Sequence, residues 1–255
     1  MAPVLVHAVR AGLLAAFFAG TVALSHQTPP GDVYPVVTPM DGGFVVTYRS
    51  SLENRFYSRA YGLDGRPLAE KRPVPESKVP TRARSVNSSR GLKGIPSDKA
   101  HAVQGAIFQG TSTGAVSDGK TAEWLRITKE DASLCRLSIS TLAQRCTRLG
   151  KVLEGPMGIP LLDEPLARGA ERAVFWLSAE GRLMFSSWER YSDAPVQTRT
   201  VGGEWNWNTS LASAVSGDTA LLAAHLPTAE GVFRIRTWTV QWPMERGNPG
   251  GALRK

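Results

Sequence analysis

Short apolar strands alternate with polar turns along most of the chain. Four stretches share one order of features: a short β-like run, a turn, a strongly apolar strand, a second turn and an alternating strand. They span residues 38–68, 114–149, 165–197 and 213–242. Alternation of apolar and polar side chains is typical of strands that are buried on one face only. The pattern therefore predicts an all-β fold made of repeated units.

The spacing of the apolar strands indicates how the units are arranged. The strands at 44–48, 122–127, 173–177 and 220–224 begin 78, 51 and 47 residues apart. Without an insertion of roughly 25–30 residues in the first interval, the period becomes about 50, as in propellers. One small sheet cannot cover both of its faces, so such sheets stack against one another. We predict a β-propeller-like array of about four blades over residues 26–245, with a β-sandwich as the alternative.

The first repeat carries a resemblance to a known family. It reads DGGFVVTYRS at 41–50 and RFYSRAYGLDGRPL at 55–68. This order of glycine, apolar strand, aromatic strand and Asp-Gly turn resembles the blade repeat of secreted bacterial β-propellers. The match is good here and diffuse in the other repeats. The resemblance implies a fold and a ligand-binding, adhesive or scaffolding role, and it carries over no catalytic residue.

The first 25 residues differ from the rest of the chain. Arg10 precedes an apolar run at 11–24, which is shorter than the ~20 residues that span a bilayer. Such a run is typical of a signal peptide, with cleavage expected before His26. We therefore expect a secreted or periplasmic protein. An uncleaved membrane anchor and an organelle-targeting peptide are the alternatives.

The net charge of +8 is concentrated in one segment. Residues 71–99 contain eight Lys or Arg and two Asp or Glu, and no aromatic residue. We interpret 76–99 as a basic surface loop that either contacts a polyanion or only keeps the protein solvated. Base-stacking surfaces interleave aromatic side chains with cations, so no nucleic-acid partner is expected. The tail at 246–255 lacks periodicity, and we expect it to be flexible.

The chain has two cysteines, Cys135 and Cys146. The repeat alignment places them on neighbouring strands of one hairpin, where they can bond. A helical stripe of leucines through the same segment is an alternative, and it would separate the two residues by roughly 16 Å along the helix axis. Export to an oxidising space favours the disulfide over two buried thiols.

Searches for catalytic motifs find one match. Residues 110–114 fit G-x-S-x-G around Ser112, which in hydrolases needs a strand turning sharply into a helix. Residues 102–109 can supply the strand, but the residues after Ser112 are a poor helix, so we interpret Ser112 as a turn residue. His101 and His225 have no metal-ligand spacing and are interpreted as structural. No cofactor and no metal is expected.

Two tryptophans are the best candidates for a ligand site. Trp205 and Trp207 share one face of an extended segment, beside Asn and Glu. Paired indoles suit a sugar-binding platform, and packing between blades is the alternative. The sequence is best interpreted as a non-catalytic binding or scaffold module that recognises a protein or glycan. The rivals are a hydrolase with a site built from loops and a membrane-anchored accessory subunit of a larger complex.

Overall fold

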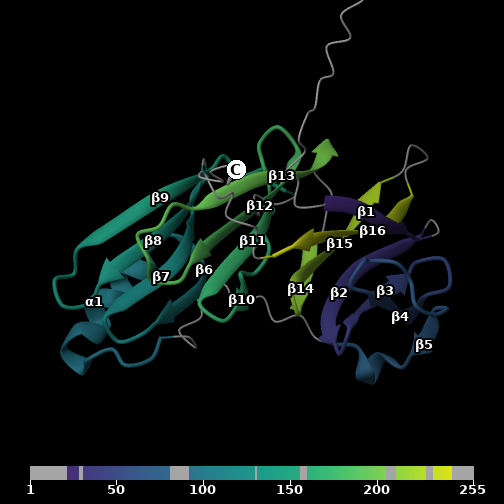
Figure 1. Ribbon diagram of the computed structural model, residues 1–255, viewed down its shortest axis with the longest axis horizontal. Coiled ribbons are helices and arrows are strands. Elements are labelled where there is room, and N and C mark those ends of the chain that lie inside the picture. Colours follow the sequence, from purple (N-terminus) through teal and green to yellow (C-terminus); the bar gives the residue numbers. More distant parts are fainter. Residues whose placement is uncertain are drawn as a thin grey trace, which may run out of the picture.

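The computed structural model describes residues 22–28, 31–80, 92–129, 131–155, 160–204, 211–227 and 232–242. In these segments the chain forms four antiparallel sheets of four strands each (Figure 1). The predicted all-β, propeller-like array of four repeated sheets is confirmed. Trp205, Trp207 and the tail at 246–255 lie outside the described residues.

Each sheet is called a blade. Blade 1 consists of β2 (Asp32–Met40), β3 (Gly43–Ser50), β4 (Arg55–Gly62) and β5 (Arg72–Val74). Blade 2 consists of β6 (Thr111–Ser117), β7 (Thr121–Ile127), β8 (Ala132–Ser138) and β9 (Gln144–Gly150). Blade 3 consists of β10 (Leu166–Arg168), β11 (Glu171–Leu177), β12 (Arg182–Glu189) and β13 (Gln197–Glu204). Blade 4 consists of β14 (Leu211–Ser216), β15 (Thr219–Pro227), β16 (Phe233–Gln241) and β1 (Val22–Gln27).

The first strand of the chain completes the last sheet, because β1 pairs with β16. The four apolar strands predicted from the sequence are β3, β7, β11 and β15, the second strand of each blade. The signal-peptide cleavage expected before His26 falls inside β1. Cleavage there would leave only His26 and Gln27 of this strand, and it stays a prediction.

The blades stack in the order 2, 3, 4, 1. One apolar cluster joins blades 2 and 3 through residues such as Leu125 and Val174. A second cluster joins blades 3 and 4, and a third joins blades 4 and 1. Figure 1 shows blades 2 and 1 at opposite ends of the molecule. In the described part of the chain the array is therefore open, since blades 1 and 2 share no apolar cluster.

A helix was not expected, and the interpretation of 102–109 as a strand is wrong. Residues Ser97–Ile107 form α1, which begins directly after Pro96. Val103 and Ile107 lie four residues apart, on one face of the helix, and are fully buried against the outer face of blade 2. The last residues of the expected basic loop, 97–99, belong to the first turn of α1. A 3-10 helix, η1 (Glu76–Lys78), lies at the other end of that loop.

The predicted disulfide between Cys135 and Cys146 is present. The two residues are directly opposite each other on β8 and β9, with their Cα atoms 4.1 Å apart. The helical alternative for this segment is wrong, because both cysteines lie in strands. The bond lies on the face of blade 2 that α1 covers.

Candidate ligand site on blade 1

The structure places the candidate residues from the sequence as follows. Trp205 and Trp207 are not described, but Leu211, which begins the next strand, pairs with Ala224 beside His225. Ser112 is fully buried in the strand β6, so its interpretation as a turn residue is wrong. Before Ser112 the chain passes from the helix α1 into the strand β6, whereas a nucleophile elbow passes from a strand into a helix. Ser112 therefore lacks the backbone geometry that the G-x-S-x-G motif has in hydrolases.

Tyr34 is the most unusual residue near this end of the array. Its side chain is 62% exposed, and its backbone φ is +54°. A β-bulge interrupts the pairing of β2 with β3 between Val33 and Val36, and it contains Tyr34. Left-handed backbone at a bulky residue costs free energy on the order of 1–3 kcal/mol and persists where its surroundings enforce it.

His225 is the residue that holds Tyr34 in this conformation. The backbone N–H of Tyr34 donates a hydrogen bond to His225 Nδ1 at 3.2 Å. The two rings meet edge to face with centroids 5.3 Å apart, and His225 meets Phe233 in the same way at 5.1 Å. His225 is buried. We call these three residues the aromatic cluster; it joins strands β2, β15 and β16.

A surface pocket of about 630 Å³ lies on the same blade. It is lined by Arg49, Asn54, Arg55, Phe56, Pro73, Val74, Pro75 and Glu76. Its volume is within the range of small-molecule sites. We call it the arginine pocket.

One row of directly paired residues in blade 1 leads to the arginine pocket. Val33 is paired with Arg49, Arg49 with Phe56, and Phe56 with Val74. Directly paired residues point to the same face of a sheet. The row therefore crosses all four strands of blade 1 on the face turned away from blade 4, whereas the Tyr34 ring contacts His225 of blade 4.

Arg49 and Arg55, the two arginines of the pocket, form no ion pair with an acidic residue in the described part of the chain. The Arg49 guanidinium donates a hydrogen bond to Asn54 Oδ1. The nearby Glu53 carboxylate accepts hydrogen bonds from Lys71 Nζ, at 2.8 Å, and from the Tyr57 hydroxyl. The hydrogen bond from Lys71 is the main cause that lowers the pKa of Glu53.

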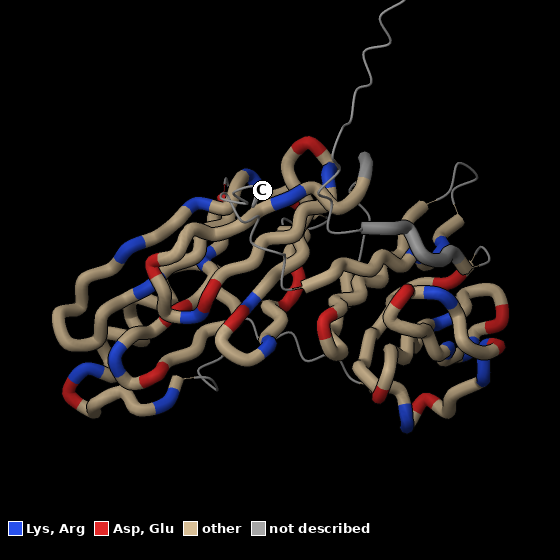
Figure 2. Tube along the Cα trace, viewed as in Figure 1, with Lys and Arg blue, Asp and Glu red and all other residues tan. Residues whose placement is uncertain are grey.

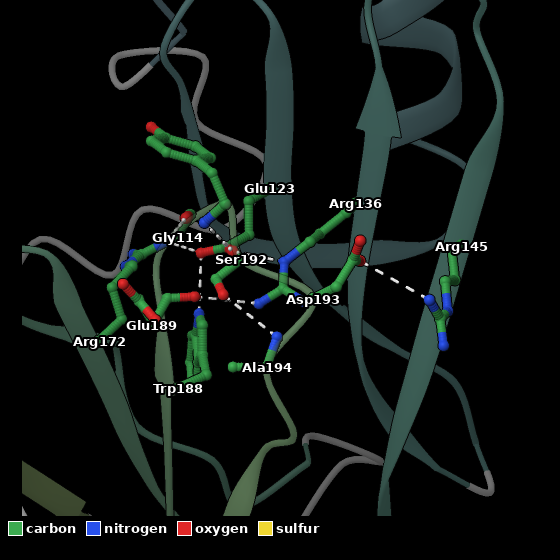
Figure 3. A network of polar contacts seen from close by, with 11 residues as sticks. Gly114, Glu123, Arg136, Arg145, Arg172, Trp188, Glu189, Ser192, Asp193 and Ala194 are labelled. Carbon is green, nitrogen blue, oxygen red and sulfur yellow. Dashed lines mark hydrogen bonds and ion pairs between the residues drawn. The ribbon is translucent and has the colours of Figure 1, made fainter.

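A second polar cluster lies between blades 2 and 3 (Figure 3). Glu123 is fully buried. Its carboxylate accepts hydrogen bonds from Trp188 Nε1 at 2.8 Å and from Arg136 Nε at 2.9 Å. It also accepts one from the backbone N–H of Tyr191 at 3.1 Å, and Arg172 lies 3.8 Å away. Because protein donors occupy both carboxylate oxygens, this cluster joins two blades and leaves Glu123 little capacity to bind a ligand.

Two further carboxylates are buried. Asp163 accepts a hydrogen bond from Ser213 Oγ at 2.6 Å, which joins blades 3 and 4. Burial raises the pKa of Asp32 at the start of β2. In the described part of the chain, no three His, Cys, Asp or Glu side chains come together to hold a metal ion.

Positively and negatively charged residues are mixed along the chain in all four blades. Figure 2 shows basic and acidic residues interspersed over all four blades. The arginine pocket is thus a local feature on a surface that carries both signs. Within the described segments, no helix has the length and apolar character needed to cross a bilayer.

Comparison of the chain with protein-family profiles and with curated proteins finds no match. Solved structures that it resembles include a GH43_1 enzyme from Xanthomonas citri in complex with xylotriose, at 10% identity and a TM-score of 0.28, covering 81% of this chain and 68% of that one. An α-L-arabinofuranosidase from Podospora anserina in complex with cellotriose has 13% identity and a TM-score of 0.30, covering 84% and 69%. A variant of Aleuria aurantia lectin in complex with α-methyl-L-fucoside has 12% identity and a TM-score of 0.29, covering 82% and 61%. At these values the resemblance assigns no family, and the fold described above stands on the strand order of the chain itself.

Proposed function

We propose that this protein is a non-catalytic glycan-binding module that works outside the cytoplasm. The observation that carries the proposal is the exposed ring of Tyr34, held in a strained backbone conformation by the buried His225. Strained residues of this kind cluster at ligand clamps and active sites. A rigid, exposed aromatic ring is suited to stack on the apolar face of a sugar.

Trp205 and Trp207 extend this proposal on sequence grounds. The segment that contains them joins β13 to β14, and β14 begins at Leu211, which pairs with Ala224 next to His225. The two tryptophans lie outside the described residues, and they enter the proposal as saccharide-binding residues on their sequence alone. Under this proposal Trp205→Ala weakens saccharide binding and reduces the quenching of tryptophan fluorescence by saccharide.

A hydrolase with a site built from loops is the main rival. Glycoside hydrolysis needs two carboxyl groups that flank the scissile bond, about 5–9 Å apart. Glu171 and Glu189 are directly opposite each other on β11 and β12, but the pocket beside them measures only about 160 Å³. In the larger arginine pocket, Glu76 supplies the single carboxylate among the described lining residues. These features favour binding over hydrolysis.

Export and family membership are parts of the same proposal. The apolar run at 11–24 and the disulfide fit a protein secreted or delivered to the periplasm, in the manner of secreted bacterial β-propellers. An assembly scaffold for a protein partner, an anchored accessory subunit and a polyanion contact through 76–99 remain the rival roles. Cell fractionation with N-terminal sequencing of the mature chain separates an exported chain from an anchored one.

Calorimetric titration with neutral oligosaccharides tests the binding proposal. The panel contains xylotriose, cellotriose and methyl-esterified trigalacturonate. We expect at least one to bind, Tyr34→Ala to weaken binding roughly 5- to 10-fold, and Tyr34→Phe to retain it. Phe108→Ala is the matched control, because Phe108 is 39% exposed beside α1 at the other end of the array.

Three results contradict the proposal. The first is that no saccharide binds, and the second is that Tyr34→Ala binds as tightly as the wild type. The third is release of new reducing ends during the titration, which would support the hydrolase.

A further inference from the structure

We infer that the arginine pocket is an anion subsite, and that the ligand of blade 1 is an acidic oligosaccharide with a carboxylate on one of its sugar units. This inference rests on the proposed glycan binding and specifies the ligand class. It assigns the pocket's arginines to the carboxylate and the apolar wall of the same pocket to the sugar ring.

The chemistry of the lining supports this assignment. Arg49 and Arg55 are both exposed, and neither forms an ion pair with a described acidic residue. A guanidinium binds a carboxylate through two parallel hydrogen bonds, which makes it selective for planar anions. The hydrogen bond between Arg49 and Asn54 Oδ1 orients one of the two guanidinium groups before a ligand arrives. Among the described lining residues Glu76 is the one acidic side chain, so they carry two positive charges and one negative charge.

The apolar part of the lining favours a saccharide over a bare anion. Phe56 is half-buried, and in its row it lies between Arg49 and Val74. Pro73, Val74 and Pro75 also line the pocket and form its apolar wall. Inorganic phosphate or sulfate has no surface that such a wall would contact. A sugar ring has an apolar face for it and a carboxylate for the arginines.

The geometry of blade 1 sets the size of the ligand. The row from Val33 to Val74 crosses three strand spacings of about 4.8 Å, or about 14 Å in all. That length corresponds to roughly three sugar units laid across the strands. An acidic trisaccharide can therefore lie along this row with its carboxylate in the arginine pocket.

The test uses two ligands that differ only in charge: trigalacturonic acid and its methyl ester. For the wild-type protein at low salt, we expect the acid to bind roughly 5- to 20-fold more tightly than the ester. In the double variant Arg49→Gln/Arg55→Gln, the acid should bind only as tightly as the ester, while ester binding stays unchanged. Arg66→Gln is the matched control, since the Arg66 side chain is 80% exposed on the same blade but outside the pocket. Thermal unfolding of each variant establishes that it is folded.

The outcomes separate the failure of this inference from that of the proposed function. Equal binding of acid and ester by the wild type overturns the anion subsite and leaves glycan binding intact. A preference for the acid that survives in the double variant overturns the assignment to Arg49 and Arg55. Failure to bind either ligand, together with the rest of the neutral panel, overturns both proposals. Arginine-dependent binding of anionic phosphatidylglycerol vesicles without preference between the saccharides overturns the saccharide in favour of a lipid headgroup.

Discussion

Blade 1 and blade 2 lie at the two ends of the same open array, and their outer faces differ. The outer face of blade 2 is apolar, with Trp124 and Cys135 fully buried beneath α1. The corresponding face of blade 1 carries the row with Arg49 and Phe56, which is partly exposed and borders a pocket. Among the described residues, α1 covers the outer face of blade 2, and no α-helix covers the outer face of blade 1. This difference is the reason for proposing the ligand site on blade 1.

The largest effect is expected where blade 2 joins the array. Glu123→Ala removes the buried carboxylate and leaves Arg136 and Arg172 without it. We expect a loss of about 3–5 kcal/mol in the free energy of unfolding, measured by urea denaturation. The control Glu70→Gln, at a side chain that is 94% exposed, should cost little. A loss below 1 kcal/mol for Glu123→Ala would show that the blade 2–blade 3 interface does not depend on this cluster.

The next effect compares the covered face with the open one. Ile107→Ala removes a fully buried side chain under α1 and should cost about 2–4 kcal/mol. Phe56→Ala, on the open face of blade 1, should cost less than about 1 kcal/mol while weakening ligand binding. Equal losses of stability in the two variants would refute the difference between the two end faces.

The disulfide gives a third, smaller effect on blade 2. The double variant Cys135→Ser/Cys146→Ser should lose about 2–3 kcal/mol in the chain-entropy account of a short closed loop. Saccharide binding by blade 1 should remain unchanged, because the bond lies at the far end of the array. Lost binding in a folded double variant would contradict the separation of the two ends.

The smallest effect is a pH dependence that originates in blade 1. Burial raises the pKa of Asp32, so its ionised form is disfavoured in the folded protein. The contribution of Asp32 to stability is therefore present at low pH and is lost as pH rises through the raised pKa. The difference in unfolding free energy between the wild type and Asp32→Asn should shift in favour of the variant from pH 4 to pH 7. A shift in the opposite direction would contradict the raised pKa.

The sequence predicted the repeat well because the apolar strands dominate it. Residues 173–177 and 220–224 read as continuous apolar runs, as expected for strands that are buried on both faces, and both belong to the two middle blades. The corresponding runs of blades 1 and 2 contain polar residues, Thr47 in β3 and Glu123 and Arg126 in β7. The presence of polar residues in only two of the four runs could have been used to predict which blades lie at the ends of the array.

Other features depend on contacts that the sequence pattern does not show. The helix α1 was missed because Val103 and Ile107 are only two apolar residues in a short segment, and their burial depends on the face of blade 2. The strained backbone of Tyr34 depends on His225, which is 191 residues away. The arginine pocket arises from the pairing register of three strands, and a pattern search over single strands cannot find it.

Hydrogen–deuterium exchange with and without bound saccharide tests the central claim most directly, because it locates the ligand without assuming any residue. With the tightest-binding trisaccharide, we expect protection in peptides that cover 31–36, 49–56 and 72–76, and no change in 97–138. Protection confined to blade 2 or blade 3, or no protection at any peptide, would contradict a ligand site on blade 1.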